Sequence, residues 1–220
     1  TANAIGSLGD NARVLKGLIK KNLILKEAIN NHKCESGSIV IHTRWASVGE
    51  VNISNCHPIT NIQDGKNTIS PIILTSMNGD IYNYKEVISS CSKYNHENYD
   101  NDCTTDCLAF PIALTENDSL DLNLVSKTIN EFSGSFTVAI QGSSKPGSVL
   151  LCCNGKQGLY IGISNDNIMF ASDVYGLIES CRYFFPVKSG SIFSISNNYP
   201  IYSDGFKLEI KQLDNEKKYF

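Results

Sequence analysis

The second half of the chain is a series of short apolar runs separated by turn residues, and this pattern limits the possible folds more than any other feature. Runs of strand-like composition occupy residues 136–140, 149–153, 159–163 and 168–171. Asn154-Gly155 and Asn165-Asp166-Asn167 have the composition of tight turns. Parallel neighbours need long connections, so strands joined this closely must pair antiparallel. The sequence therefore predicts an antiparallel meander, continued by strands at 183–187 and 191–196 and a weak one at 207–210.

The first half combines helical patterns with short strands. Apolar residues repeat every three to four positions between residues 10 and 31, which predicts a helix with Asp10 as its N-cap. Further helices are expected at 84–92, 104–114 and 120–132, with strands at 38–43 and 72–74. Pro111 should kink or split the middle helix. A shorter helix, capped by Asp173, is expected to end near Ser180.

Composition indicates a packed globular domain and argues against nucleic acid or membrane partners. Of the 220 residues, 41% are hydrophobic and 19% charged, and the net charge is −3. That charge is too small to favour nucleic acid or an anionic membrane. Neither a membrane-spanning run nor a signal-peptide layout is visible, so we expect a cytoplasmic protein. The whole pattern is typical of one α+β domain with two sheets.

The eight cysteines have no regular spacing, which favours reduced thiols over a disulfide framework. Cys103 and Cys107 could share a helical face and bind a metal ion, but no second pair stands near them. We therefore expect neither a metal nor a cofactor.

A polar stretch that follows the strand at 38–43 is the strongest sign of function. His42 to Glu50 reads His-Thr-Arg-Trp-Ala-Ser-Val-Gly-Glu, and Asn55-Cys56-His57-Pro58 comes soon after. A guanidinium such as that of Arg44 can hold a carboxylate through two parallel hydrogen bonds. Taken alone, Arg44 would more often form a structural ion pair, Asp106 would more often cap a helix, and Asn78-Gly79 would more often be a turn.

Taken in order, these motifs resemble the glutaminase domain of class II glutamine amidotransferases. The set is His-Thr-Arg-Trp-Ala, then Asn-x-His-Pro, Asn-Gly-x-Ile-x-Asn, Thr-Asp, Gly-Ser-Phe and Ala-Ser-Asp, and it spans about residues 5–195. It is most similar to the glucosamine-6-phosphate synthases, while Asn78–Asn83 also resembles asparagine synthetases. We expect the domain to cover residues 1–210, with 211–220 a tail or the start of a linker to a synthase domain.

The resemblance implies an N-terminal-nucleophile hydrolase fold, a four-layer α/β/β/α sandwich of two antiparallel sheets. It also implies hydrolysis of L-glutamine, with the ammonia passed to a sugar-phosphate isomerase-like synthase domain that forms glucosamine 6-phosphate from fructose 6-phosphate. It implies that Arg44 binds the α-carboxylate of glutamine and that Asp106 binds its α-amino group. It also implies that Trp45, Ser47 and His57 line the pocket wall, and that Asn78 and Gly79 form the oxyanion hole. The sequence does not determine the quaternary structure, and a homo-oligomer is compatible with it.

The required chemistry agrees with these roles. A free amino acid presents one carboxylate and one ammonium, so a selective site needs a fixed cation and a fixed anion. Amide hydrolysis passes through a tetrahedral oxyanion that needs preorganised N–H donors. An Asn side chain and a Gly backbone can supply two of them.

The sequence departs from the family in one essential group. The family's nucleophile is an N-terminal cysteine, whereas this chain begins Thr1-Ala2-Asn3 and the family's first strand has no counterpart. Ser47 and Val48 also replace a Thr and a His. Three explanations are open: the segment with the cysteine lies outside this chain, the domain is a non-catalytic binding module, or Thr1 is the nucleophile. We favour the first.

Overall fold

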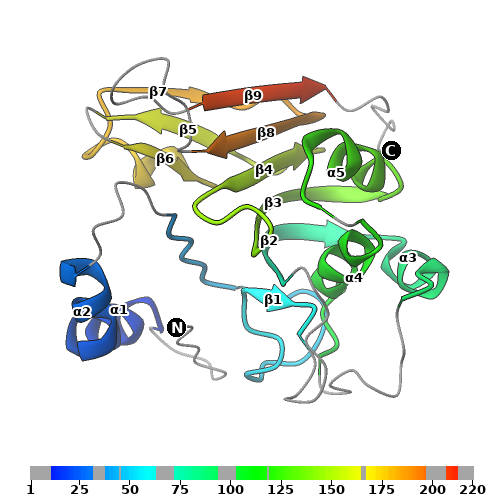
Figure 1. Ribbon diagram of the computed structural model, residues 1–220, viewed down its shortest axis with the longest axis horizontal. Coiled ribbons are helices and arrows are strands. Elements are labelled where there is room, and N and C mark those ends of the chain that lie inside the picture. Colours follow the sequence, from blue (N-terminus) through cyan, green and yellow to red (C-terminus); the bar gives the residue numbers. More distant parts are fainter. Residues whose placement is uncertain are drawn as a thin grey trace.

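The computed structural model describes residues 11–31, 38–44, 46–62, 72–93, 103–117, 119–164, 167–196 and 207–212. Within these residues it confirms the α+β class, with two antiparallel sheets and helices packed against them (Figure 1). The larger sheet has the order β1-β2-β3-β4-β8-β9, and the smaller one the order β6-β5-β7.

The larger sheet positions the site through its β2 strand. Its strands are β1 (Ile59–Thr60), β2 (Ile73–Ile81), β3 (Gly134–Gly142), β4 (Val149–Asn154), β8 (Ser191–Ser196) and β9 (Lys207–Gln212). The strand expected at 72–74 continues to Ile81, so the interpretation of Asn78-Gly79 as a turn is wrong. Gly79 instead pairs with Phe136 on β3, which keeps this pair of residues in the sheet at the pocket wall.

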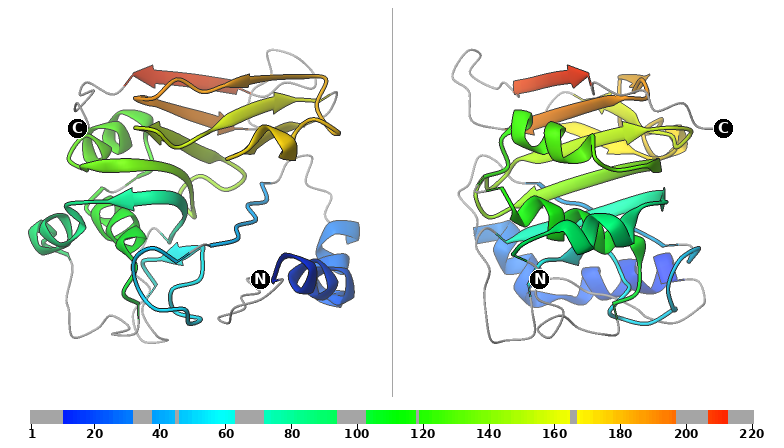
Figure 2. Two further views of the ribbon diagram at one scale, coloured as in Figure 1. Left: turned by 180° about the vertical axis from the view of Figure 1, so that it is seen from behind. Right: turned by 90° about the vertical axis from the view of Figure 1, so that its right-hand side faces the viewer.

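The strands predicted after Gly134 and their antiparallel pairing are confirmed, but the prediction of one continuous meander is wrong, because the strands divide between the two sheets. β5 (Tyr160–Ile163), β6 (Ile168–Ala171) and β7 (Tyr183–Pro186) form the smaller sheet. An apolar core that includes Leu151, Phe193 and Ile161 lies between the sheets, because β4 and β8 turn one face toward β5. Figure 2 shows the smaller sheet beside β4 and β8 from behind.

A second core lies between the other face of the larger sheet and three helices. These are α3 (Tyr84–Ser90), α4 (Ala109–Thr115) and α5 (Leu122–Ile129). The rings of Phe110 and Phe132 stack at 4.6 Å, and Phe136 of β3 meets the Phe110 ring edge-on at 5.2 Å. Pro111 lies inside α4, so the expected break is misplaced: a short 3₁₀ helix, η2 (Asp106–Leu108), precedes α4 instead.

Two other helix predictions need correction. The helix expected near Ser180 is only the 3₁₀ turn η3 (Val174–Gly176), although Asp173 does cap it by accepting a hydrogen bond from the Tyr175 N–H at 3.0 Å. The N-terminal helical pattern forms two helices, α1 (Asn11–Lys21) and α2 (Leu23–Asn31), separated at Asn22. The expected cap Asp10 lies outside the described residues.

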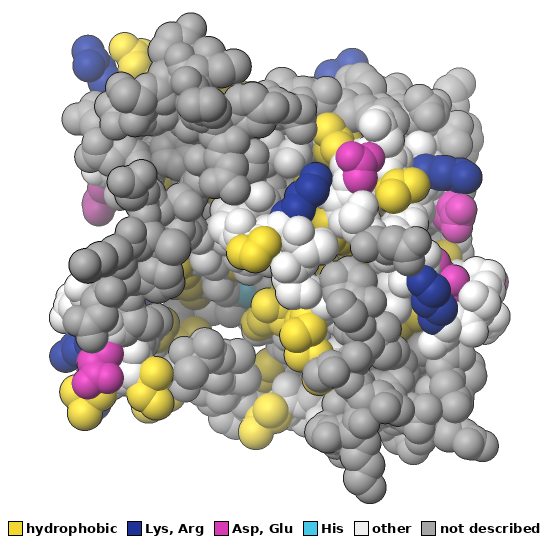
Figure 3. Space-filling view, viewed as in Figure 1, with side chains coloured by type: hydrophobic (Ala, Val, Ile, Leu, Met, Phe, Trp, Pro, Cys, Tyr) yellow, Lys and Arg dark blue, Asp and Glu magenta, His cyan; other side chains and the backbone are white. Residues whose placement is uncertain are grey.

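The strand expected at 38–43 does not form in the described part of the chain, where these residues have no ladder partner. Val40 packs on the core between the sheets, whereas Ile39 and Ile41 are 73% and 67% exposed. The side chains therefore alternate as in a strand, which explains the prediction. Figures 1 and 2 show α1 and α2 at the opposite end of the molecule from α3. Figure 3, viewed as in Figure 1, shows hydrophobic side chains around a hollow on the face toward the viewer.

No helix among the described residues is long and apolar enough to cross a membrane.

Candidate functional site

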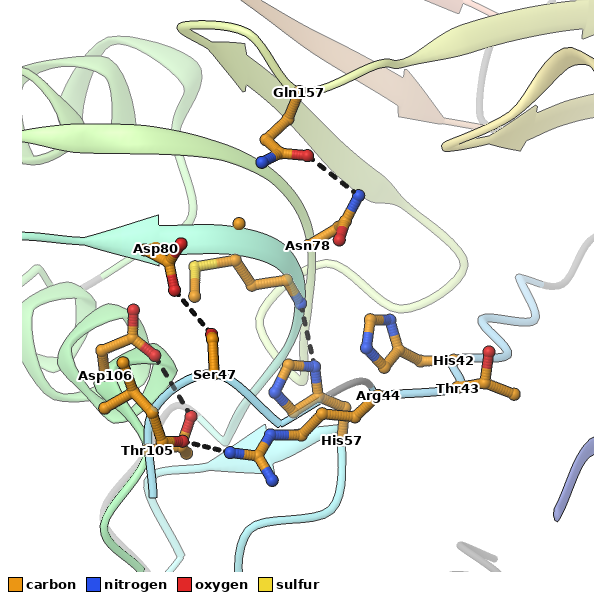
Figure 4. Close-up of a pocket in the computed structure, with 13 residues that line it drawn as sticks. His42, Thr43, Arg44, Ser47, His57, Asn78, Asp80, Thr105, Asp106 and Gln157 are labelled. Carbon is orange, nitrogen blue, oxygen red and sulfur yellow. Dashed lines mark hydrogen bonds between the residues drawn. The ribbon is translucent and has the colours of Figure 1, made fainter. Parts of the chain in front are cut away.

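A pocket of about 210 Å³ lies at the end of β2 that carries Asn78 and Gly79. Five separate segments of the chain contribute to its wall (Figure 4). The lining residues are His42, Thr43, Arg44, Ser47, Val48, His57, Met77, Asn78, Gly79, Asp80, Thr105, Asp106 and Gln157. All the site residues predicted from sequence are therefore brought together except Trp45, which lies outside the described residues.

Arg44 is fixed by the loop that follows it. Its guanidinium donates one hydrogen bond to the carbonyl oxygen of Val48 and another to that of Glu50, the latter at 3.3 Å. A guanidinium has five N–H donors, so these bonds hold the group in place and leave donors for a ligand. The carbonyl groups of the loop therefore surround the arginine. A lysine has no planar guanidinium and could not hold these carbonyl groups in the same fork geometry.

Asn55 joins this loop to the residues before Asp106, and sequence reasoning gave it no such role. Its side chain is fully buried. The Asn55 Nδ2 donates to the Glu50 carbonyl and the Thr104 hydroxyl, both at 3.0 Å. Its Oδ1 accepts from the backbone N–H groups of Thr104, at 2.7 Å, and Thr105, at 3.0 Å. One amide thus sets the spacing between the cationic and anionic sides of the pocket.

Asp106 is a buried carboxylate tied to β2, and the interpretation of this residue as a helix cap is wrong. Its Oδ2 accepts a hydrogen bond from the Ile81 N–H at 2.7 Å, and its Oδ1 accepts one from the Thr105 hydroxyl at 3.3 Å. Burial raises the pKa of this carboxyl, and the nearby Asp80 carboxylate raises it further. A bound cation would relieve this penalty, because an opposite charge favours the ionised form.

Asp80 and Gln157 also line the pocket, although sequence reasoning did not select them. The Ser47 hydroxyl donates to Asp80 Oδ1 at 2.6 Å, so Ser47 ties the Arg44 loop to β2. Asp80 could have been identified as a pocket residue from its position directly after Asn78-Gly79. Gln157 had no signal, because it comes from the loop after β4 and reaches the pocket only through the fold.

Gly79 has a backbone conformation that excludes a side chain. Its φ is +115°, and a Cβ built there would lie 2.1 Å from the carbonyl oxygen of Ser135 on the paired strand. L-residues rarely adopt this conformation, so glycine is required. Beside it, the Asn78 Nδ2 donates to Gln157 Oε1 at 3.2 Å.

Two neutral histidines support the same strand. The Met77 N–H donates to His57 Nδ1 at 3.1 Å, so the ring proton of His57 is on Nε2. The His42 ring stacks on it with centroids 4.3 Å apart. Burial, followed by the charges of His42 and Arg44, lowers the pKa of His57 to about 2, and burial with Arg44 lowers that of His42 to about 4. His57 therefore acts as a neutral acceptor that supports β2.

Within the described part of the chain, no cysteine lines the pocket. Cys107 follows Asp106 but is fully buried, and its Sγ lies 3.6 Å from the Thr75 hydroxyl. Burial raises the pKa of the Cys107 thiol, which makes it a poor nucleophile.

Comparison with known proteins shows which proteins this chain is similar to. The family described as "Glutamine amidotransferase domain" matches residues 55–179, more than half of the chain. The glutamine–fructose-6-phosphate aminotransferase (isomerizing) of Acinetobacter baylyi is 27% identical over 195 residues, covering 86% of this chain and 30% of the relative. That of Clostridium acetobutylicum is 30% identical over 183 residues, covering 82% and 28%. The chain thus spans less than a third of these relatives' length.

A solved structure has the same fold at low sequence identity. Glutamine phosphoribosylpyrophosphate amidotransferase from B. subtilis superposes with a TM-score of 0.55 at 15% identity, over 76% of this chain and 33% of that one. This likeness concerns the fold alone.

Proposed function

This chain belongs to the family of glutamine amidotransferase domains, and from that premise we propose that it hydrolyses the side-chain amide of L-glutamine to glutamate and ammonia. The family and the N-terminal-nucleophile hydrolase fold are those that the ordered motifs predicted. The proposal depends on one observation: Arg44, Asp106 and the Asn78-Gly79 pair lie around a single pocket.

The charges of the pocket suit a free α-amino acid. The Arg44 guanidinium would hold the α-carboxylate, and Asp106, with Asp80 close by, would hold the α-ammonium. Both Asp106 and Arg44 already have partners in the protein that fix their position, so little ordering is needed on binding. Ser47, His57 and Trp45 are proposed to shape the wall around the substrate.

The reaction would pass through a tetrahedral intermediate. A thiolate adds to the side-chain carbonyl carbon of glutamine, and the carbonyl oxygen becomes an oxyanion opposite Asn78 and Gly79. The C–N bond then breaks, the nitrogen takes a proton and leaves as ammonia, and water hydrolyses the thioester to glutamate. The thiol, as the resemblance implies, would be an N-terminal cysteine on a segment outside these 220 residues.

Ammonia release from glutamine tests the proposal. The full-length protein should release ammonia from L-glutamine but not from D-glutamine or glutaramate, which misplace or lack the α-ammonium. A chloroketone analogue of glutamine should label one cysteine and abolish activity, and peptide mass spectrometry would locate it. Absence of both activity and labelling would refute the proposal.

A non-catalytic binding module is the alternative, and the pocket lining favours it in one respect, since no thiol lies there among the described residues. A binding module would bind glutamine or a partner without releasing ammonia. Calorimetric titration with glutamine, run beside the ammonia assay, separates the two functions.

We further propose that the ammonia is used by a synthase domain. The curated relatives are named for transfer to fructose 6-phosphate and are about three times longer than this chain. Glucosamine 6-phosphate is therefore the product to test first, by adding fructose 6-phosphate to the full-length protein with glutamine as the nitrogen source.

A further inference from the structure

Gln157 is in contact with both members of the proposed oxyanion hole. Its Oε1 accepts the hydrogen bond from Asn78 Nδ2 at 3.2 Å, and its Cγ lies 2.9 Å from the position that a Cβ on Gly79 would occupy. Figure 4 shows the two amides pointing toward each other across the pocket wall. Asn78 is exposed, so packing alone does not fix the orientation of its amide.

The loop that carries Gln157 is anchored along its length. Four hydrogen bonds hold its backbone, between 2.7 and 3.2 Å long. They run from Lys156 N to Ser135 Oγ, from Gly155 N to Ser189 Oγ, from Cys153 Sγ to the Gln157 carbonyl, and from Thr137 Oγ1 to the Gly158 carbonyl. Gln157 is therefore presented to Asn78 from a fixed backbone rather than from a free hairpin tip.

An amide paired with another amide can be held in either of two directions. In the present direction Asn78 donates and its Oδ1 faces away from Gln157. If both amides rotate by half a turn, Gln157 Nε2 donates to Asn78 Oδ1, and the Asn78 NH₂ group faces away from Gln157 instead. Both directions keep one hydrogen bond, because each amide has a donor side and an acceptor side. A developing oxyanion favours the direction that offers it N–H groups.

We propose that Gln157 is a positioning residue for amide hydrolysis: it holds the Asn78 amide at the pocket wall and becomes the donor when Asn78 turns its NH₂ toward the oxyanion. This inference rests on the proposed function. Gln157 touches Asn78 rather than the reacting atoms, so its effect should appear in kcat for glutamine and leave KM nearly unchanged.

Two variants of similar size separate this role from simple packing on Gly79. Gln157→Met keeps the side-chain length but removes both donor and acceptor. Gln157→Glu, when ionised, can only accept, so it locks Asn78 in the present direction and adds a negative charge beside the oxyanion. In the full-length protein at about pH 8, kcat should fall about 5- to 10-fold for Gln157→Met and about 100-fold for Gln157→Glu.

The pH dependence provides a readout that a structural role would not change. As the carboxylate introduced by Gln157→Glu gains a proton near its ordinary pKa of about 4.3, its O–H can donate to Asn78 Oδ1. The kcat of Gln157→Glu relative to that of wild type should therefore rise as the pH falls from about 8 to about 5. The wild-type profile corrects for the other charged and titratable groups nearby. Of these, His42, Arg44, His57, Asp80 and Asp106 line the pocket, and Lys156 precedes Gln157 in the chain.

Side-chain amide signals in nuclear magnetic resonance test the contact without turnover. In Gln157→Glu, the Asn78 NH₂ signals should shift with the titration of the introduced carboxylate, and in wild type they should stay constant over the same range. The proposal would be overturned if the Asn78 signals of Gln157→Glu did not shift with this titration. It would also be overturned if the two variants lost equal kcat and had the same pH profile. A wild type that releases no ammonia would instead refute the proposed function, and with it the catalytic part of this inference, while the signals still decide whether Gln157 orients Asn78.

Discussion

Replacement of Asn55 by alanine should lower the free energy of unfolding of the domain and weaken the binding of glutamine in the pocket. The variant loses four hydrogen bonds. Glu50 and Thr104 are exposed and can turn to water, but Thr105 is buried, so its N–H is left without an acceptor. An orphaned buried donor costs about 1–3 kcal/mol, and the rehydrated bonds together cost about 1 kcal/mol more. We therefore expect the free energy of unfolding to fall by about 2–4 kcal/mol.

Urea unfolding followed by circular dichroism measures this loss, and the KM for glutamine of the full-length protein measures the second effect. Because Asn55 sets the distance between Arg44 and Asp106, KM should rise about tenfold, which corresponds to about 1.4 kcal/mol of binding free energy. Asn61→Ala is a matched control, since Asn61 is also fully buried and hydrogen-bonded, but its side chain bonds Thr115 and Ile73, which do not line the pocket. It should lose similar stability with no change in KM. A loss below about 0.5 kcal/mol for Asn55→Ala, or a similar KM in both variants, would refute the reasoning.

Three further predictions follow from the same geometry. Gly79→Ala should destabilise the domain by about 2 kcal/mol or more in urea unfolding, because its Cβ meets a backbone oxygen at 2.1 Å; Gly17→Ala on α1 meets nothing within 4 Å and should be neutral or stabilising. His42 and His57 resist protonation in the fold, with pKa values of about 4 and 2, so the unfolded chain binds more protons and stability should fall as pH drops below about 6.5. The loss should reach at most about 2 kcal/mol per histidine at about pH 5, and a His57→Gln variant that shows the same pH slope as wild type would contradict this assignment. Arg44→Lys should raise the KM for glutamine about 10- to 100-fold with a smaller change in kcat; an unchanged KM would remove Arg44 from the substrate site.

Particular residues show which parts of the site could be found from sequence. Arg44, Asp106 and Asn78-Gly79 were found because their types and order are specific, and the pocket contains all of them. Asn55 was seen only as part of a motif, since a buried asparagine that joins two loops looks like any loop asparagine. Gln157 gave no signal at all, because its partner Asn78 is 79 positions away.

The errors have equally physical causes. Asn78-Gly79 usually marks a turn, but here Gly79 adopts its positive φ inside a strand that pairs closely with Ser135 and Phe136. Asp106 was expected to cap a helix, but Thr105 holds the N-cap position of η2 and the Asp106 carboxylate accepts the hydrogen bond of the Ile81 N–H on β2. In both cases a contact with a distant strand overrode a local preference.

The sequence by itself determined the strands after Gly134 with their antiparallel pairing, the helices α3, α4 and α5, and the family, because periodicity, turn residues and ordered motifs are local properties of the chain. Only the tertiary structure decided how these strands divide between two sheets and which groups share the pocket. It also decided the neutral state of His42 and His57 and the pairing of Gln157 with Asn78. Burial, electrostatic environment and amide direction depend on neighbours that are remote in sequence, and these neighbours exist only once the chain has folded.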